Sequence, residues 1–521
     1  MTQPSALQPR VSAPRGERRL RRVAVVGGGT AGWMAAAMLK RALHNLDIEL
    51  TVVESAEIGT VGVGEATIPP IIDLLTFLDI NEADFIRRTQ ATFKLGIVFE
   101  DWSHLGGRYW HPFGAFGAPI GRRPFVHSWH RAVAEGLSPS VSDFSLCAAL
   151  GDQGRFRKRD PDLSSIASGL RYALHFDAGL VAQYLRAYAE HLGAKRIERT
   201  VVGVDLAGPD RIEALRFFDG GRLEADLFID CTGFQGLLIE GALKAGYEDW
   251  SEWLPCDRAV AAPSAIVGPR PPYTEARALE AGWRWRIPLQ HRVGNGYVYS
   301  SRHLSDDEAA DQLRRTTNGA LLAEPRQLRF VAGRRRKVWK GNCVALGLSS
   351  GFLEPLESTS IQLIMNGVYN LLDRFPDLDF DPHNIAAYNA ELEEDIERIR
   401  DFIILHYALT AREDTAFWRE RRGAKLPASL QERIDLYQAT GRIKPKAGEL
   451  FTDLSWFYVF EGMGVRPRAY DPLADVPGAE PFGAILSELS GLTRAAARQA
   501  PLHDTWLGAS EASTTSRAAS S

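Results

Sequence analysis

The sequence predicts an α/β protein with a parallel-sheet core, an additional sheet and a mainly helical second region. Three observations support this fold class. A strand, a glycine-rich turn, a helix and a second strand follow one another over residues 21–54, which is the pattern of a β-α-β unit. Several short strand-like runs lie between residues 200 and 348. A long charged helix is then expected over residues 384–406.

The length and composition allow this organisation. The chain has 521 residues, of which 45% are apolar and 24% charged, the usual mixture of a globular protein. At about 100–200 residues per domain, this length allows about three units, or one large fold with an elaborated second region. We predict a disordered basic arm over 1–20, a core over 21–380 that is discontinuous and includes pocket-side segments at 70–160, a mainly helical region over 381–506 that completes the pocket, and a disordered tail over 507–521.

Charge and cysteine content exclude several classes of protein. The 61 Lys and Arg residues against 65 Asp and Glu give a net charge of −4, which argues against binding of nucleic acid or of a membrane surface. The four cysteines form no C-x-x-C pair, which excludes a zinc knuckle and a disulfide scaffold and indicates the cytoplasm. The arginines before the apolar stretch 23–39 imitate a targeting leader, but that stretch is too short and too rich in glycine to cross a bilayer. His127 and His130 have no partner cluster, so no metal site is predicted.

The first glycine turn has the context of a dinucleotide site. Gly27, Gly29 and Gly32 form a G-x-G-x-x-G motif between a buried strand and a helix, and Glu54 ends the second strand. The first glycine allows a tight turn, the second lets a pyrophosphate approach the backbone, and the third allows close packing of helix on strand. The helix N-terminus faces the phosphates, and Glu54 is placed to accept from a ribose hydroxyl. The alternative is a plain glycine turn.

Two later glycine turns favour FAD over NAD. D-C-T-G at 230–233 and N-C-V-A-L-G-L-S-S-G at 342–351 each follow a strand-like run. Three separated turns suit the long FAD molecule, which touches its domain repeatedly. The sequence shows no second G-x-G-x-x-G unit for a nicotinamide cofactor, so we expect the flavin to be reduced elsewhere. The alternative is that the later turns only close loops.

The alternating run F-K-L-G-I-V-F at 93–99 predicts one strand, with its four apolar residues on one face and Lys94 on the other. The face of Lys94 is then either solvent or an internal channel. Burial would lower the lysine pKa from about 10.4, so that the amine could act as a nucleophile as well as a hydrogen-bond donor. The alternative is a surface lysine on an edge strand.

Seven short motifs are spread over the chain: G-G-G-T-A-G-W at 27–33, V-G-V-G-E-A-T-I-P at 61–69, F-K at 93–94, H-F-D at 175–177, D-C-T-G-F at 230–234, W-R-W-R-I-P at 283–288 and L-E-P-L-E-S-T at 353–359. Together they resemble the flavin-dependent halogenases of the tryptophan-halogenase type, from Val23 to about Arg468. The W-x-W-x-I-P string is the most specific motif, because general flavin monooxygenases lack it. The resemblance implies an FAD-binding, Rossmann-like core of the flavin monooxygenase type, and a strap at 57–67 that links the flavin and substrate sites.

The resemblance also implies catalytic roles. Lys94 is the catalytic lysine, and Glu357 stabilises positive charge on the substrate ring and then assists proton loss. Glu354 is expected to be structural, capping the turn before the next helix. Thr359 and Ser360 begin that helix and would hold the halide with their N–H groups.

The substrate and flavin contacts follow from the same resemblance. His111 and Phe113 would sandwich an indole ring, and Trp456 would be the third wall of the pocket. Core packing is the alternative for all three residues. The implied flavin contacts are Gly27, Gly29, Thr30, Ala31, Gly32, Glu54, Glu65, Ala66, Val202, Leu348 and Ile361.

The implied activity is halogenation of an indole-like aromatic compound by reduced FAD, O2 and a halide, with hypohalous acid passing to Lys94. A separate NAD(P)H-dependent reductase would supply FADH2, and a homodimer is compatible with this activity. No grip for an amino acid is recognisable near Trp456, so indole or a larger indole-bearing molecule is expected to react better than free tryptophan. Tryptophan-specific members usually carry glycine where Ser360 stands, and bromide is easier to oxidise than chloride, so we expect bromination to be faster. The alternatives are a flavin-dependent hydroxylase and a non-catalytic flavin-binding protein.

Overall fold

The computed structural model describes residues 18–55, 64–121, 123–137, 139–444, 448–476 and 478–508. No helix in these ranges is long and apolar enough to span a lipid bilayer. Of the expected strap at 57–67, only the end from Gly64 lies within the described residues.

A six-stranded sheet forms the core of one half of the molecule. Its strand order is β20–β21–β12–β1–β2–β8, and every neighbouring pair is parallel except β20 and β21. The strands are β1 (Arg22–Val26), β2 (Glu49–Glu54), β8 (Lys195–Glu198), β12 (Leu227–Asp230), β20 (Trp339–Lys340) and β21 (Cys343–Ala345). Because β1, β12 and β21 are parallel, the three glycine turns that follow them meet at one edge of the sheet.

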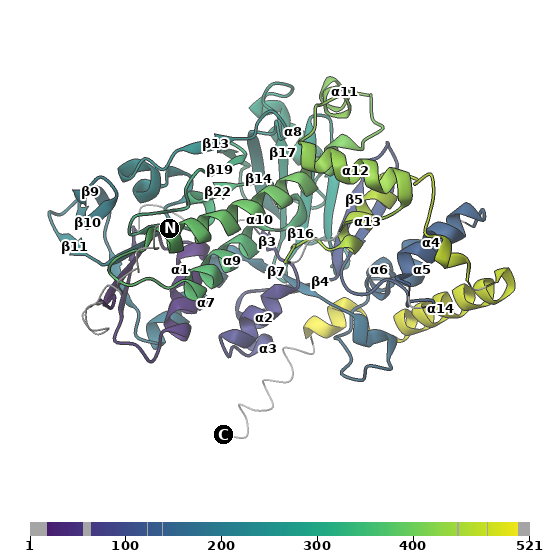
Figure 1. The fold of residues 1–521 in the computed structure, drawn as a ribbon, viewed down its shortest axis with the longest axis horizontal. Helices are drawn as coiled ribbons and strands as arrows, with labels where there is room; N and C mark the ends of the chain where they lie inside the picture. The colour runs from purple at the N-terminus through teal and green to yellow at the C-terminus, as the bar shows by residue number, and fades with distance from the viewer. Residues whose placement is uncertain are drawn as a thin grey trace, which may run out of the picture.

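Helices cover one face of this sheet, and a small sheet covers the other. The helices α1 (Thr30–Ala42), α7 (Ala178–His191) and α9 (Ser360–Asp373) pack together, with α1 in contact with both others (Figure 1). Residues 32–39 of α1 are all buried, which explains their unbroken apolar character. The opposite face packs against the antiparallel strands β9 (Val201–Gly208), β10 (Arg211–Phe217) and β11 (Arg222–Glu224).

A seven-stranded sheet forms the core of the other half of the molecule, and its strand order is β18–β14–β17–β16–β15–β5–β6. All its neighbouring pairs are antiparallel except β5 and β15. The strands are β5 (Gly96–Glu100), β6 (Arg108–Pro112), β14 (Arg258–Ser264), β15 (Thr274–Ala278), β16 (Gly282–Pro288), β17 (Val293–Tyr299) and β18 (Arg326–Arg329). A third sheet joins the two halves and consists of β3 (Gly64–Ala66), β7 (Ala173–Asp177) and β4 (Thr92–Lys94). Strand β3 packs on β16 and β17 of the seven-stranded sheet, and β7 contacts α7, which covers the six-stranded sheet.

The C-terminal part of the chain is helical. Its helices are α10 (Pro382–Ala408), α11 (Ala416–Arg422), α12 (Ala428–Thr440), α13 (Asp453–Gly462) and α14 (Ala479–Gln499). Helix α13 packs on β6, and α14 packs on α5 (Val141–Phe144) and α6 (Leu146–Asp152). The other elements are α2 (Pro70–Phe77), α3 (Glu82–Arg88), α4 (Phe125–Ala134), α8 (Asp306–Thr316), β13 (Tyr247–Asp249), β19 (Gly333–Arg335) and β22 (Gly351–Phe352). The predicted fold class is confirmed: a parallel core, an additional sheet and a mainly helical second region.

The prediction of one continuous strand over 93–99 is wrong. Strand β4 ends at Lys94, and β5 begins at Gly96 in a different sheet. Both faces of this run are buried, including Lys94 and Val98. The alternation reflects the passage of the chain from one sheet to another, between two layers of the core, rather than a solvent-facing side.

Both predicted disordered ends are too long. Leu20 is buried, and Arg18 pairs with Asp377 at 3.0 Å, so the basic arm does not extend to residue 20. Residues 503–508 are helical, and Leu507 packs in the main apolar core, so the tail does not begin at residue 507. In both cases an apolar side chain buried against the core holds the backbone.

Candidate active site

The first glycine turn lies at the carboxyl end of β1. Gly27 has a φ of +115°, and a Cβ built on it would lie 2.2 Å from the carbonyl oxygen of Cys231, which follows β12. A Cβ on Gly32 would lie 1.8 Å from the carbonyl oxygen of Gly27. Both positions therefore require glycine, as the motif predicts. Gly29 is the N-cap of α1 and offers no side chain, so the first N–H groups of the helix stay open toward a ligand.

Glu54 ends β2 directly beside this turn. A Cβ on Gly28 would lie 1.7 Å from the Glu54 Oε2, so the carboxylate touches the turn. The Nε1 of Trp33 donates to Oε2 at 3.1 Å, and Arg196 pairs with Oε1. Glu54 thus lies beside the first glycine turn, with both carboxylate oxygens bound by neighbouring side chains. Its contact with a ribose hydroxyl stays a prediction.

Lys94 ends β4 and is completely buried. Its Nζ donates to the carbonyl oxygen of Thr67 at 2.9 Å and to the Oγ of Ser358 at 2.8 Å, and lies 5.3 Å from the centre of the Phe113 ring. Burial lowers the pKa of Lys94 from 10.5 to about 7, although the charge of Glu357 raises it. Both the neutral and the charged amine are therefore populated near neutral pH. The alternative of a surface lysine is excluded.

Glu357 lies in a short 3-10 helix, Pro355–Glu357, and is also buried. The Nδ1 of His111 donates to its Oε2 at 2.8 Å, and the Nε2 of His406 lies 2.8 Å from its Oε1. Burial alone would raise the pKa of Glu357, but the two imidazoles outweigh this effect and lower the pKa to about 2. The carboxylate is therefore ionised near neutral pH.

The loop after Glu357 joins this carboxylate to the lysine and to α9. Ser358, with a φ of +60°, contacts Lys94 and is followed by the buried Thr359, the N-cap of α9, and by Ser360. The Thr359 side chain makes no capping hydrogen bond, and the backbone bonds of the helix begin with the N–H of Leu363 donating to the Thr359 carbonyl. The predicted halide residues therefore lie at an open helix start immediately beside Ser358.

This arrangement can be compared with known proteins. A family model described as tryptophan halogenase matches residues 22–479. The chain belongs to the tryptophan halogenase family. Its relatives include the 7-chloro-L-tryptophan 6-halogenase KtzR of Kutzneria sp. (strain 744), which is 39% identical over 438 residues, covering 80% of this chain and 84% of the relative.

Solved structures place this halogenase among flavin-dependent enzymes. The flavin-dependent halogenase Xcc4156 from Xanthomonas campestris superposes with a TM-score of 0.90 at 46% identity, covering 94% of this chain and 98% of that chain. The flavin-dependent halogenase BrvH from Brevundimonas sp. BAL3 superposes with a TM-score of 0.91 at 43% identity, covering 94% of this chain and 99% of that chain. The predicted family and fold are confirmed, and the protein is a flavin-dependent halogenase.

The residues of the glycine-turn edge fit the flavin that this family uses. A Cβ on Gly347, in the third turn, would lie 2.8 Å from the Cβ of Ala31, so the first and third turns are in contact. Asp230 of the second turn accepts from the backbone N–H groups of Thr232, Leu238 and Ile239, and so shapes its own turn. The edge therefore offers an open helix N-terminus and closely approached backbone, as a flavin dinucleotide needs.

The other predicted flavin contacts lie in several elements. Thr30 begins α1 and donates to the carbonyl oxygen of Ala178, and Leu348 lies in the third glycine turn. Ile361 lies in the first turn of α9, and Glu65 and Ala66 lie in β3. Burial raises the pKa of Glu65 to about 7. Val202 lies on β9 with 55% of its surface exposed, and its contact with the flavin stays a prediction.

The predicted substrate rings are only partly brought together. His111 binds Glu357, and Phe113 lies beside the amine of Lys94. Trp456 is buried, and its ring packs edge-on against Phe402 at 5.0 Å between ring centres. The ring of Phe402 in turn lies 5.7 Å from that of His111, so Phe402 lies between Trp456 and the His111 imidazole in this series of contacts. That Trp456 forms a wall of the substrate pocket therefore stays a prediction, because Phe402 is the ring that contacts the His111 imidazole.

Three further residues, none of them predicted from the sequence, belong to the site. His406, in α10, contacts Glu357, and its Nδ1 lies 2.9 Å from the hydroxyl of Tyr109. Ser358, between Glu357 and Thr359, contacts Lys94. Only Ser358 carried a signal, its place inside L-E-P-L-E-S-T; nothing in the spacing of His406 and Tyr109 marks them out.

Glu354 does not cap the turn, contrary to expectation. Its side chain makes no capping bond and instead accepts from the Nε1 of Trp283 at 2.8 Å and from the hydroxyl of Tyr407 at 2.6 Å. Burial raises the pKa of Glu354 to about 7, despite these two donors. The first tryptophan of W-x-W-x-I-P thus holds the loop that carries Glu357 against β16 and α10.

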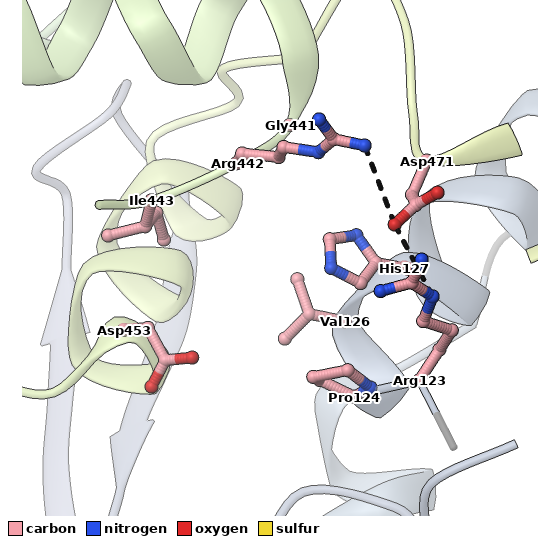
Figure 2. Close-up of a pocket in the computed structure, with 9 residues that line it drawn as sticks. All are labelled: Arg123, Pro124, Val126, His127, Gly441, Arg442, Ile443, Asp453 and Asp471. Atoms are coloured by element: carbon pink, nitrogen blue, oxygen red, sulfur yellow. Dashed lines mark ion pairs between the residues drawn. The ribbon is translucent and has the colours of Figure 1, made fainter. Parts of the chain in front are cut away.

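A separate cavity of about 410 Å³ lies away from these residues, between α4 and the segments around α12 and α13 (Figure 2). Arg123 and Arg442 approach the carboxylate of Asp471 at 3.7 Å and 3.5 Å, and His127 lies between them. Asp453 lines the facing wall. None of the predicted site residues lines this cavity, so it is distinct from the lysine–glutamate site.

Proposed function

We propose that this halogenase halogenates an indole-like aromatic substrate, with bromination faster than chlorination, and that hypohalous acid passes to Lys94. The observation that carries this proposal is the contact between the Nζ of Lys94 and the Oγ of Ser358, which brings a buried amine beside the residue that follows Glu357. An amine and an ionised carboxylate in one buried site suit transfer of an electrophile followed by removal of a proton.

Lys94 would hold the halogen. When bound, reduced FAD would supply hypohalous acid from O2 and a halide ion. The neutral amine can attack the halogen, so that an N–X bond forms, the O–X bond breaks and water leaves. The charged amine can instead donate a hydrogen bond to hypohalous acid and orient it. Since the pKa of Lys94 is about 7, both forms are available at neutral pH.

Glu357 would act on the ring. Attack of the ring on the halogen forms a C–X bond, breaks the N–X or O–X bond, and leaves positive charge on the ring. The electron pair of the broken bond stays on the lysine nitrogen, or on hydroxide, which then takes a proton from the charged lysine to become water. The ionised carboxylate of Glu357, oriented by His111 and His406, stabilises that charge and accepts the ring proton. With these roles His111 orients the base, in addition to its predicted contact with the substrate.

The halide and substrate preferences rest on residue chemistry. Ser360 adds a side chain at the open start of α9, and bromide is less strongly hydrated and more easily oxidised than chloride. Relatives named as tryptophan halogenases support an indole ring in the substrate. Without a recognisable partner, desolvating an ammonium or a carboxylate costs on the order of 1–3 kcal/mol per group, so indole should be favoured over tryptophan.

The partners follow from the proposed reaction. A separate NAD(P)H-dependent reductase would supply reduced flavin. Because the oxidised flavin must return to that reductase after each turnover, FAD must bind to the halogenase and leave it readily. All four cysteines are free and buried, in keeping with a cytoplasmic protein. A homodimer is proposed as well, and size-exclusion chromatography with light scattering tests it.

Product analysis tests this function. The protein is incubated with FAD, a flavin reductase, NADH and indole in the presence of either chloride or bromide. We expect a product heavier than indole by one halogen minus one hydrogen. A hydroxylated product without a halide requirement would indicate a monooxygenase, and no product with retained flavin binding would indicate a non-catalytic flavoprotein.

A further inference from the structure

The strand that carries Lys94 is at the edge of its sheet, and its outer side is bound by other parts of the chain. Within the described part of the chain, strand β4 pairs only with β7. On the opposite side, the N–H of Phe93 donates to the Nε2 of His503 at 3.2 Å. The next outward N–H, that of Leu95, donates to the carbonyl oxygen of Pro272 at 2.8 Å. An edge strand without such partners would leave buried N–H groups unpaired.

His503 is held in one tautomer by this geometry. Its Nδ1 lies 2.8 Å from the carbonyl oxygen of Arg270, which can only accept, so Nδ1 carries the proton. The Nε2 then has a free lone pair and accepts from Phe93. A protonated imidazole would direct a second N–H at the Phe93 N–H, so the arrangement requires the neutral ring. Burial agrees with this, since it lowers the pKa of His503 to about 4.

The chain around His503 is bound to the core as well. The N–H of His503 donates to the carbonyl oxygen of Gly154, and the carbonyl oxygen of Pro501 accepts from the N–H of Phe156. The ring of Phe156 stacks on that of Phe93 with 3.9 Å between centres. This segment lies beyond residues 22–479, the range that the family model matches.

We propose that His503 is a positioning residue for halogen transfer, because it holds the backbone of Phe93 and thereby the amine of Lys94. Two residues of other segments, Thr67 and Ser358, bind the amine at its tip. A shift of β4 relative to these segments therefore moves Nζ away from both acceptors and admits water to the amine. A misplacement of about 1 Å in such a site can reduce the rate about 100-fold.

Paired amide substitutions test this proposal, which rests on the proposed role of Lys94. His503→Asn keeps a donor for the Arg270 carbonyl but is too short to accept from Phe93. His503→Gln can extend a carbonyl oxygen to the Phe93 N–H. Leu502→Ser is the control, because Leu502 is the neighbouring residue and 53% of its surface is exposed.

Two readouts are measured on the full-length variants loaded with FAD. The first is the pH midpoint of Lys94, followed by NMR of its 13Cε in protein with labelled lysine, which reports the amine without any turnover. The second is the rate of indole halogenation. For His503→Asn we expect the Lys94 midpoint to rise by about one pH unit or more and the rate to fall about tenfold or more. We expect FAD affinity to change less than about twofold, and His503→Gln and Leu502→Ser to stay within about threefold of wild type in rate.

An unchanged Lys94 midpoint and rate in His503→Asn would overturn the positioning role. An equal loss in His503→Asn and His503→Gln, with the midpoint unmoved, would also overturn it, since it would show a general loss of packing. Lys94→Ala separates the two proposals. If that variant still halogenates, the proposed function of the lysine fails, whereas the Lys94 midpoint in His503→Asn still reports on positioning.

Discussion

The Nζ of Lys94 lies 2.8 Å from the Oγ of Ser358, although the two residues are 264 positions apart in the sequence. Ser358 has a left-handed backbone, with φ at +60°, which lets the chain turn from Glu357 into α9 while its hydroxyl meets the lysine. The contact ties the small sheet that carries Lys94 to the loop that carries Glu357. It makes the hydroxyl of Ser358 the direct structural link between the two predicted catalytic residues.

Removing that hydroxyl should slow halogenation without loss of folding. A net hydrogen bond of about 1 kcal/mol corresponds to a rate loss of about fivefold if it orients the amine in the transition state. Ser358→Gly removes the hydroxyl and relieves the left-handed backbone, so its melting temperature should not fall, whereas Ser358→Ala should be less stable. Steady-state rates and thermal unfolding of both variants check this, and an unchanged rate in Ser358→Gly would contradict it.

Lys94→Ala should abolish halogenation and leave the flavin chemistry intact. We expect consumption of reduced FAD by O2 and the affinity for FAD to persist, since Lys94 is proposed to act after the flavin. Product mass and stopped-flow flavin absorbance measure the two steps separately. If the variant keeps more than about a tenth of the wild-type rate, Lys94 does not carry the halogen.

Lys94→Met should stabilise the protein in a manner that depends on pH. The folded protein lowers the pKa of Lys94 to about 7, against 10.5 for the free side chain, so the unfolded chain binds the proton more tightly. The resulting destabilisation is complete below about pH 7 and disappears as the pH rises toward about 10.5. Urea unfolding at pH 7 and at pH 10 should show a larger advantage for Lys94→Met at pH 7. An advantage independent of pH would exclude this titration.

Glu357→Gln should slow product formation by about 100-fold or more, because the amide can neither stabilise the ring cation nor accept its proton. Flavin affinity should change little, since the carboxylate of Glu357 binds His111 and His406 rather than the glycine turns. His406→Gln, which retains a donor for the carboxylate, is the matched variant and should be affected less. A rate for Glu357→Gln close to that of wild type would remove the carboxylate from the proposed reaction.

Gly27→Ala should lose flavin binding. The added Cβ would meet the Cys231 carbonyl at 2.2 Å, and its φ of +115° is strained for alanine. Added FAD should raise the melting temperature of the wild type but not of this variant. Gly208→Ala is the control, since nothing lies within 4 Å of its added Cβ and its φ is not in the left-handed region. Tight, stoichiometric FAD in Gly27→Ala would contradict the assignment of the turn.

Substrate and halide preference can be measured in one competition. Equimolar indole and tryptophan are supplied together, once in bromide and once in chloride. We expect halogenated indole to exceed halogenated tryptophan and the bromide reaction to be faster. A clear preference for tryptophan with chloride would show that an amino-acid grip exists and that Ser360 does not bias the halide site.

The sequence by itself determined the architecture of the glycine-turn edge of the six-stranded sheet. Gly27, Gly32 and Glu54 were predictable because a close backbone approach admits only glycine, and because parallel strands end at the same edge of a sheet. The helical second region was predictable for the same kind of local reason, its periodicity over 384–406. Local residue types and spacing are sufficient where the constraint acts within one β-α-β unit or one helix.

Only the tertiary structure decided how the lysine is enclosed. The alternation over 93–99 suggested one strand with an open face, but the chain passes between two sheets there and buries Lys94 on every side. His406 joins Glu357, and His503 joins Phe93, through contacts between segments that no local pattern relates. The pKa of an ionisable group depends on burial and on charges brought from distant segments, so the chemistry of Lys94 and Glu357 is set by packing rather than by their motifs.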